Sequence, residues 1–163
     1  MPDQQQWPAR KSPRLQGFDY ASEGAYFITI CVQNRMHLFG TVRDDKMHLN
    51  SAGEMVVTRW LEIAARYPHV DLDAFVIMPN HLHGIVLLEQ QDVGLTQIIQ
   101  WFKIVTTNRF IQGHRQHGWE NFTGKLWQRS FHDHIVRSEV ELNRIREYVM
   151  HNPALWTTDT LYS

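Results

Sequence analysis

The sequence has one cysteine among its 163 residues and no apolar run long enough to span a bilayer. The lone Cys31 excludes an internal disulfide and a cysteine-rich zinc cluster, and its apolar surroundings predict a buried structural thiol. A transmembrane helix would need roughly 18 consecutive apolar residues. The N-terminus is polar and lacks a signal-peptide core. We therefore expect a cytoplasmic protein with no membrane partner.

An excess of positive charge is also lacking, because the formal net charge is −1. The charge is nevertheless unevenly distributed. Residues 38–92 carry four Lys/Arg against eight Asp/Glu, whereas residues 93–137 carry six against two and include many aromatic side chains. Basic residues interleaved with aromatics suit a phosphate backbone with unstacked bases. An ordinary solvated face over a core explains the same composition, and composition alone leaves both interpretations open.

Hydrophobic residues make up 43% of the chain and charged residues 20%, which is typical of a globular protein. The length favours one domain over residues 1–163, with an extended basic arm at 1–17 and a C-terminal tail at 154–163. Trp156 and Leu161 could pack this tail over the rest of the domain. The expected elements are a strand at 26–32, a hairpin within 37–49 turning at Asp44-Asp45, a helix from Ser51, strands at 71–78 and 81–88, a helix at 96–110, a loop at 112–128, a strand at 131–136 and a last helix from Ser138 to before Pro153.

Two capping boxes mark helix starts, Ser51 with Glu54 and Ser138 with Glu141. The predicted apolar stripe of the first helix consists of Val57, Trp60, Leu61 and Ala64. The order of strands and helices indicates an α+β fold, with a ferredoxin-like antiparallel sheet and helices packed on it.

The segment 78–86, MPNHLHGIV, carries the first candidate chemistry. Alternate side chains of a strand share a face, so His81 and His83 project together while Leu82 enters the core. Two imidazoles placed in this way can bind one divalent metal, although a pair of exposed strand histidines is the simpler interpretation. His132 and His134 have the same spacing. They suit a central-strand metal site less well, because Asp133 between them would be buried on the opposite face.

The last helix carries a candidate nucleophile. Tyr148 lies four residues before Asn152 and four after Arg144, so all three share one helical face in the segment 145–153, IREYVMHNP, and the turn before it. A tyrosine that only borders the core would fit this pattern equally well.

Four motifs in order, YFITICVQNR (26–35), MPNHLHGIV (78–86), WQRSFHDHIVR (127–137) and IREYVMHNP (145–153), resemble the REP-associated tyrosine transposases. These belong to the HUH superfamily of single-tyrosine transposases of bacterial insertion sequences. The resemblance covers roughly residues 14–155. It implies that His81, His83 and Asn152 hold Mg²⁺ or Mn²⁺, and that Tyr148 attacks DNA to give a 5′-phosphotyrosine and a free 3′-hydroxyl. We further hypothesise that Arg144 helps the phenol to ionise.

The resemblance also implies a substrate, single-stranded DNA next to imperfect hairpins such as repetitive extragenic palindromes (REPs). The predicted DNA-binding residues are Arg10, Lys11, Arg14, Lys103, Arg109, Arg129 and Arg144. Members of the superfamily work as monomers or as homodimers, and the sequence does not distinguish these states.

Three other functions compete. The first is a hairpin-binding protein that no longer cuts, against which the joint presence of the histidines, Tyr148 and Asn152 argues. The second is a rolling-circle initiator or relaxase, which is usually larger. The third is a metal-dependent hydrolase without a covalent intermediate, for which Asp133 and His151 are the candidate bases.

Overall fold

Four strands form the central sheet of the computed structural model, which describes residues 24–89, 93–159 and 161. They are β1 (Gly24–Cys31), β4 (Val70–Met78), β5 (His81–Leu88) and β6 (His132–Val136). The spatial order is β4-β5-β1-β6 and every pair is antiparallel. The predicted arm, with Arg10, Lys11 and Arg14, lies outside the described residues.

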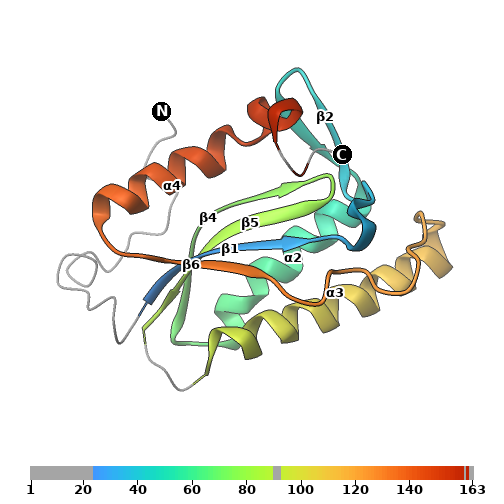
Figure 1. The fold of residues 1–163 in the computed structure, drawn as a ribbon. Helices are drawn as coiled ribbons and strands as arrows, with labels where there is room; N and C mark the ends of the chain where they lie inside the picture. The colour runs from blue at the N-terminus through green and yellow to red at the C-terminus, as the bar shows by residue number, and fades with distance from the viewer. Residues whose placement is uncertain (1–23, 90–92, 160, 162–163) are drawn as a thin grey trace.

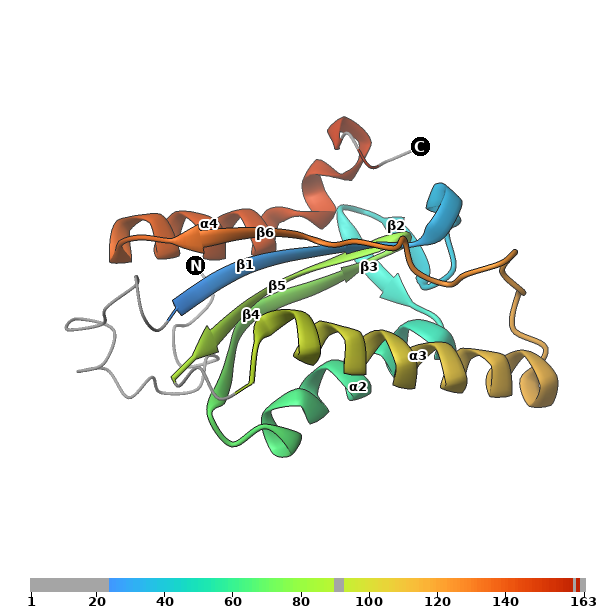
Figure 2. The ribbon, with the colours of Figure 1, turned by 60° about the horizontal axis from the view of Figure 1, so that its bottom comes forward.

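Helices cover both faces of this sheet (Figures 1 and 2). α2 (Ser51–Arg66) and α3 (Leu95–His117) lie on one face, and α4 (Glu139–His151) lies on the other. Without α4, the order β1-α2-β4-β5-α3-β6 is the split β-α-β arrangement of a ferredoxin-like fold. The predicted α+β class with an antiparallel sheet is therefore confirmed.

Smaller elements surround this frame. β1 is followed by the short 3-10 helix η2 (Gln33–Arg35) and by a separate hairpin of β2 (Gly40–Arg43) and β3 (Lys46–Leu49). The hairpin turns at Asp44 and Asp45, as predicted, and both residues have positive φ angles of 55° and 61°. A second 3-10 helix, η3 (Pro153–Thr158), follows α4. Within the described ranges, no helix is both long and apolar enough to cross a membrane.

Successive side chains of β5 point to opposite faces of the sheet, one carrying the large hydrophobic core and the other the two histidines. All eight residues of the strand are buried. Leu82, Val86 and Leu88 join the large hydrophobic core under α2 and α3. Ile85 and Leu87 join a smaller cluster with Leu142 and Val149 of α4. The same alternation directs the two histidines to the α4 side.

Gly84, in the middle of β5, allows α2 to approach the sheet closely. A Cβ atom at this position would lie 2.4 Å from Cζ2 of Trp60. Trp60 is fully buried and packs edge-on against Phe102 of α3, with ring centroids 5.3 Å apart. A glycine after the second histidine therefore leaves space for the largest side chain of the core.

The start of α2 corrects two predictions. Its N-cap is Asn50 rather than Ser51, because Asn50 Oδ1 accepts a hydrogen bond from the Gly53 N–H at 2.8 Å. The predicted capping box was one residue too late. The predicted apolar stripe was half right: Trp60 is buried and Val57 packs against the core, but Leu61 is half-exposed and Ala64 is exposed. The residues of α2 that are buried are Ala52, Gly53, Val56, Trp60 and Ile63.

α3 is longer than expected and occupies the first part of the predicted loop at 112–128. Gly113 suggested a loop, but it lies inside the helix, and its lack of a side chain leaves room for the Trp119 indole. A Cβ at Gly113 would be 2.2 Å from Cε3 of that indole. The helix ends at Gly118, which has a φ of 70° and is therefore in the left-handed conformation common at C-termini.

α4 begins where the sequence predicted. Ser138 is its N-cap, and the Oγ accepts from the Glu141 N–H at 3.1 Å. Glu141 does not return a bond to Ser138 but accepts from the Arg137 N–H at 2.7 Å. The helix ends at His151, before Pro153, as expected.

Candidate active site

His81 and His83 lie side by side on the α4 face of β5. Their partners across the sheet in β1 are Cys31 and Thr29. The imidazole centroids are 4.7 Å apart, and both side chains are almost fully buried. Leu82 between them is in the opposite core. The predicted projection of the two histidines to one face is confirmed, although they are buried rather than exposed.

Hydrogen bonds to each Nδ1 orient both rings. His81 Nδ1 lies 2.7 Å from Asn80 Oδ1. The Asn80 amide group donates to the Leu161 carbonyl at 2.6 Å, so its oxygen must accept and His81 Nδ1 must donate. His83 Nδ1 lies 2.8 Å from Thr29 Oγ1. When both Nδ1 atoms carry the proton, both Nε2 lone pairs are available for a ligand.

Burial keeps these rings neutral. Desolvation, together with the neighbouring His81, lowers the pKa of His83 to about 3. Desolvation also lowers the pKa of His81 to about 4, against the opposing effects of Asp159 and Asn152. At neutral pH both histidines are in the form that binds metals.

Three buried polar atoms on the described part of the chain have no hydrogen-bond partner and lie in this region: His81 Nε2, His83 Nε2 and Asn152 Oδ1. Asn152 is the C-cap of α4 and is fully buried. Buried polar atoms normally have partners, so their common lack of one needs an explanation. Two imidazole nitrogens and a carbonyl oxygen are suitable ligands for Mg²⁺ or Mn²⁺. The donor set therefore fits the divalent cation that the sequence resemblance implies.

Asp159, which follows η3, was not predicted. Its Oδ2 lies 3.8 Å from His81 Nε2. The ligand atoms of His81, His83 and Asp159 all lie within 4.8 Å of one another. No motif marks this aspartate, and only the expected packing of the tail through Trp156 could have pointed to it. Trp156 is indeed buried, and its ring stacks on His81 with centroids 6.0 Å apart.

Tyr148 lies on α4, one turn before Asn152. Its ring centroid is 5.4 Å from that of His83 and 6.0 Å from that of Phe27. Phe27 in turn stacks on His83 at 5.2 Å. The tyrosine is 41% exposed, so it borders the histidine pair while remaining accessible to a large substrate. Arg144, one turn earlier, is exposed.

A buried ion pair fixes α4 to the sheet, and sequence reasoning missed it. Asp73 lies at a bulge in β4, between Leu72 and Phe75, and its carboxylate is fully buried. Arg146 binds both carboxylate oxygens, with Nη2 2.7 Å from Oδ2 and Nε 3.1 Å from each oxygen. Asp73 lies just before the motif 78–86 but outside all four motifs, and nothing in its sequence context marks it as the partner of Arg146.

The rival pair, His132 and His134, is on the edge strand β6 and is exposed. His134 Nε2 lies 2.9 Å from Glu141 Oε2. Asp133 is exposed as well, which agrees with the expectation that this segment suits a central-strand metal site less well. It lies opposite Ile28 on β6, an edge strand with a neighbour on one side only.

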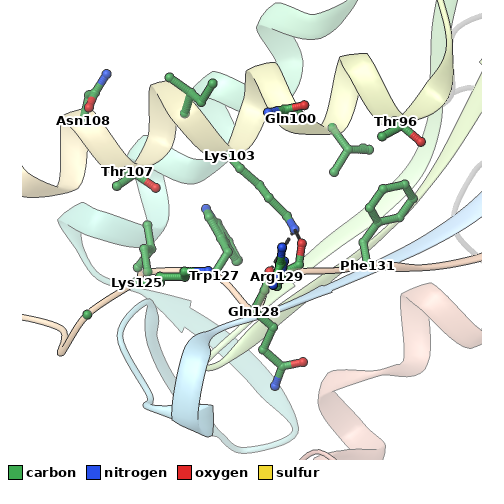
Figure 3. A pocket seen from close by; sticks show the side chains of 14 residues that line it. Thr96, Gln100, Lys103, Thr107, Asn108, Lys125, Trp127, Gln128, Arg129 and Phe131 are labelled. Carbon is green, nitrogen blue, oxygen red and sulfur yellow. Dashed lines mark hydrogen bonds between the residues drawn. The ribbon is translucent and has the colours of Figure 1, made fainter.

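Of the predicted DNA-binding residues, Lys103 of α3 and Arg129 of the following loop line a cavity of about 620 Å³ (Figure 3). Lys103 crosses it, and its Nζ donates to the carbonyls of Gln128 and Arg129 at 2.9 and 3.2 Å. Burial lowers the pKa of this lysine. Arg109, on α3, and the side chain of Arg129 are exposed. The DNA-binding role of these residues stays a prediction.

Comparison with known families gives a match along most of the chain. Residues 22–152 match the family model described as IS200-like transposases. A Haemophilus influenzae protein whose name assigns no function is 38% identical, over 94% of this chain and 93% of its own. A second protein of that organism, named as a candidate REP-associated tyrosine transposase, is 25% identical over 83% of this chain and 73% of its own.

Two solved structures have a similar fold. One is a REP-associated tyrosine transposase bound to a REP hairpin, with a TM-score of 0.62 and 20% identity over 82% of this chain and 68% of that one. The other, from Deinococcus radiodurans, is described as a candidate transposase and has a TM-score of 0.54 and 18% identity over 82% of this chain and 92% of that one. At these identities the likeness concerns the fold alone.

Proposed function

The chain belongs to the family of IS200-like transposases, and on this premise we propose that it is a metal-dependent enzyme that nicks and rejoins single-stranded DNA through Tyr148. The observation that carries the proposal is that Tyr148 lies next to the histidine pair. An accessible tyrosine borders a histidine pair whose two Nε2 atoms, together with Asn152 Oδ1, are buried without partners. The proposed nucleophile therefore lies beside two of the proposed metal ligands.

In this proposal His81, His83 and Asn152 hold Mg²⁺ or Mn²⁺. A cation bound there would supply positive charge to offset the negative charge that develops on the oxygens of the scissile phosphate. Thr29 and Asn80 keep each imidazole in the tautomer that presents Nε2. The low pKa values of the two histidines prevent protons from competing for those lone pairs at neutral pH.

Tyr148 is the nucleophile of this reaction. Its Oη loses a proton and forms a bond to phosphorus, while the bond from phosphorus to the 3′-oxygen breaks and that oxygen takes up a proton. The product is a 5′-phosphotyrosine and a free 3′-hydroxyl. Because the covalent link is a phosphodiester, a 3′-hydroxyl can reverse the step without ATP. We propose that Arg144 favours the phenolate, and normal cleavage by an Arg144→Ala enzyme would disprove this role.

We propose single-stranded DNA beside a REP-type hairpin as the substrate. A structural neighbour is described as bound to a REP hairpin, and a relative is named for the same association. The exposed Arg129 provides positive charge near the half-buried Phe131, and Arg109 is exposed on α3. These features suit a phosphate backbone and unstacked bases.

The test uses labelled single-stranded hairpin oligonucleotides from the neighbourhood of the gene, incubated with Mg²⁺ or Mn²⁺ and separated on denaturing gels. We expect the wild type to form a covalent protein–DNA adduct that Tyr148→Phe and EDTA both abolish. Tyr26→Phe, a change of the same kind on the far side of the sheet, is the control and should retain the adduct. Hairpin binding without an adduct from the wild type would instead favour a binding protein that does not cut.

A further inference from the structure

We propose that Asp159 is a fourth ligand of the divalent cation, so that the segment after α4 completes the metal site. The inference rests on the proposed function only for the existence of that site. The inference goes beyond the proposed function because it assigns a ligand outside the histidine and tyrosine motifs. Asp159 follows residues 22–152, the region that matches the family model.

The segment after α4 is fixed to the histidine pair at two points. Trp156 lies with its ring stacked on His81 at an interplanar angle of 28°, and it also contacts the His37 ring edge-on, 5.4 Å between centroids. Farther along, the Leu161 carbonyl accepts from Asn80 Nδ2 at 2.6 Å. Asn80 is the residue that orients His81, so one amide group links the ring and the tail. Asp159 lies between these two anchors.

The carboxylate of Asp159 is oriented toward the site. Its Oδ1 accepts from the Leu161 N–H at 2.9 Å, which leaves Oδ2 facing His81 Nε2 at 3.8 Å. That separation is too long for a hydrogen bond. In octahedral coordination with ligand bonds of 2.0–2.1 Å, adjacent ligand atoms are about 3 Å apart and opposite ones about 4 Å. The spacing of 3.8 Å therefore lies within the range expected for two atoms that share one cation.

Charge favours the same assignment. The Asp159 side chain is only 8% exposed, and a buried carboxylate is costly unless a positive charge compensates it. Its neighbour His81 is a neutral imidazole. Conversely, His81, His83 and Asn152 are all neutral ligands, so without Asp159 a divalent cation would lack a negative protein ligand. A carboxylate and a cation at this place would stabilise each other, and oxygen ligands are those that Mg²⁺ and Mn²⁺ prefer.

The experiment measures Mn²⁺ binding directly, from the electron paramagnetic resonance signal of free Mn²⁺, and needs no DNA. We expect Asp159→Asn to weaken binding at least tenfold, and a chain that ends at Thr158 to behave in the same way. Asp133→Asn, which removes an identical charge from the exposed edge strand, should bind like the wild type. Proton relaxation of water should show one more water on the Mn²⁺ of Asp159→Asn, because water replaces the lost ligand.

The possible failures are distinguishable. Unchanged or tighter Mn²⁺ binding by Asp159→Asn would overturn the assignment, as would weaker binding with no additional bound water, which indicates a charge effect at a distance. His83→Gln is measured in parallel. If His83→Gln abolishes binding while Asp159→Asn does not, the proposed metal site holds and Asp159 is not a ligand. If neither variant affects binding, the proposed metal site itself is wrong.

Discussion

His81 and His83 combine near-complete burial with a proposed metal-binding role that requires the neutral ring. An unfolded chain protonates a histidine near pH 6.5, whereas burial lowers the folded-state pKa to about 4 for His81 and about 3 for His83. The unfolded state therefore binds more protons between these values. Stability from both groups is fully present above pH 6.5 and decreases as the pH falls toward the folded-state values.

The first prediction follows from this difference. Without metal, the free energy of unfolding should fall between pH 7.5 and pH 5.0 by about 2 kcal/mol for each histidine, since one pKa unit corresponds to about 1.4 kcal/mol. Urea unfolding at several pH values measures it. His83→Gln cannot take up this proton and should have a shallower pH dependence. Equal slopes for the two proteins would show that His83 titrates normally in the folded state.

Sequence motifs could identify the residues of the site that are close together along the chain. His81 and His83 follow from strand alternation, and Tyr148 with Asn152 from helical spacing. Asp73, Asp159 and the pairing of Arg146 could not be predicted in this way. Each depends on contacts between distant segments, and a lone aspartate in a bulge or a tail carries no periodic signal.

At the scale of elements, hydrophobic periodicity and turn residues predicted the order of strands and helices correctly. Errors arose where the same residues were compatible with two local structures. Both Asn50 and Ser51 can cap a helix, and the Glu54 three residues after Ser51 favoured the wrong one. Gly113 favoured a loop because its contact with Trp119 is invisible in the sequence.

The second prediction tests the cap of α2. Asn50→Ala should destabilise the protein by about 1 to 2 kcal/mol, because it removes the bond to the Gly53 N–H and a further bond to the Leu38 carbonyl. Ser51→Ala, the matched variant one residue later, should change stability by less than about 0.5 kcal/mol. Chemical denaturation measures both. A larger loss of stability for Ser51→Ala than for Asn50→Ala would show that Ser51 is the N-cap, as the sequence suggested.

The third prediction concerns the attachment of α4 to β4. Asp73→Ala leaves the Arg146 guanidinium without its carboxylate and should cost about 3 to 5 kcal/mol, as breaking a buried pair does. Glu62→Ala, which breaks the more exposed pair with Arg59, should cost less than about 1 kcal/mol. Urea denaturation measures the difference. Similar small losses for the two variants would mean that the buried pair does not hold the helix.

At the scale of the whole molecule, the two faces of the sheet differ in content. The face under α2 and α3 carries the larger hydrophobic core, whereas the α4 face carries the smaller cluster together with the site (Figure 2). The ligands on that face come from β5 and from the end of α4. A bound cation would therefore connect the layer of α4 to the sheet.

The fourth prediction is that Mn²⁺ stabilises the protein as a whole. At 100 times its dissociation constant, Mn²⁺ should add about 2.7 kcal/mol and raise the Tm by roughly 5 to 10 °C. Thermal unfolding with and without EDTA measures the shift. His81→Gln should remove most of it. A shift of the same size in that variant would place the stabilising ion elsewhere.

Tyr148 and Asn152 share one helix, whereas His81 and His83 share one strand. The site thus consists of two preassembled halves, each held by backbone hydrogen bonds within a single element. A rigid displacement of α4 would leave the spacing within each half unchanged and alter only the distance between the halves. Movement of this one helix would therefore shift the proposed nucleophile and the proposed ligand Asn152 together, while leaving the imidazole pair unchanged.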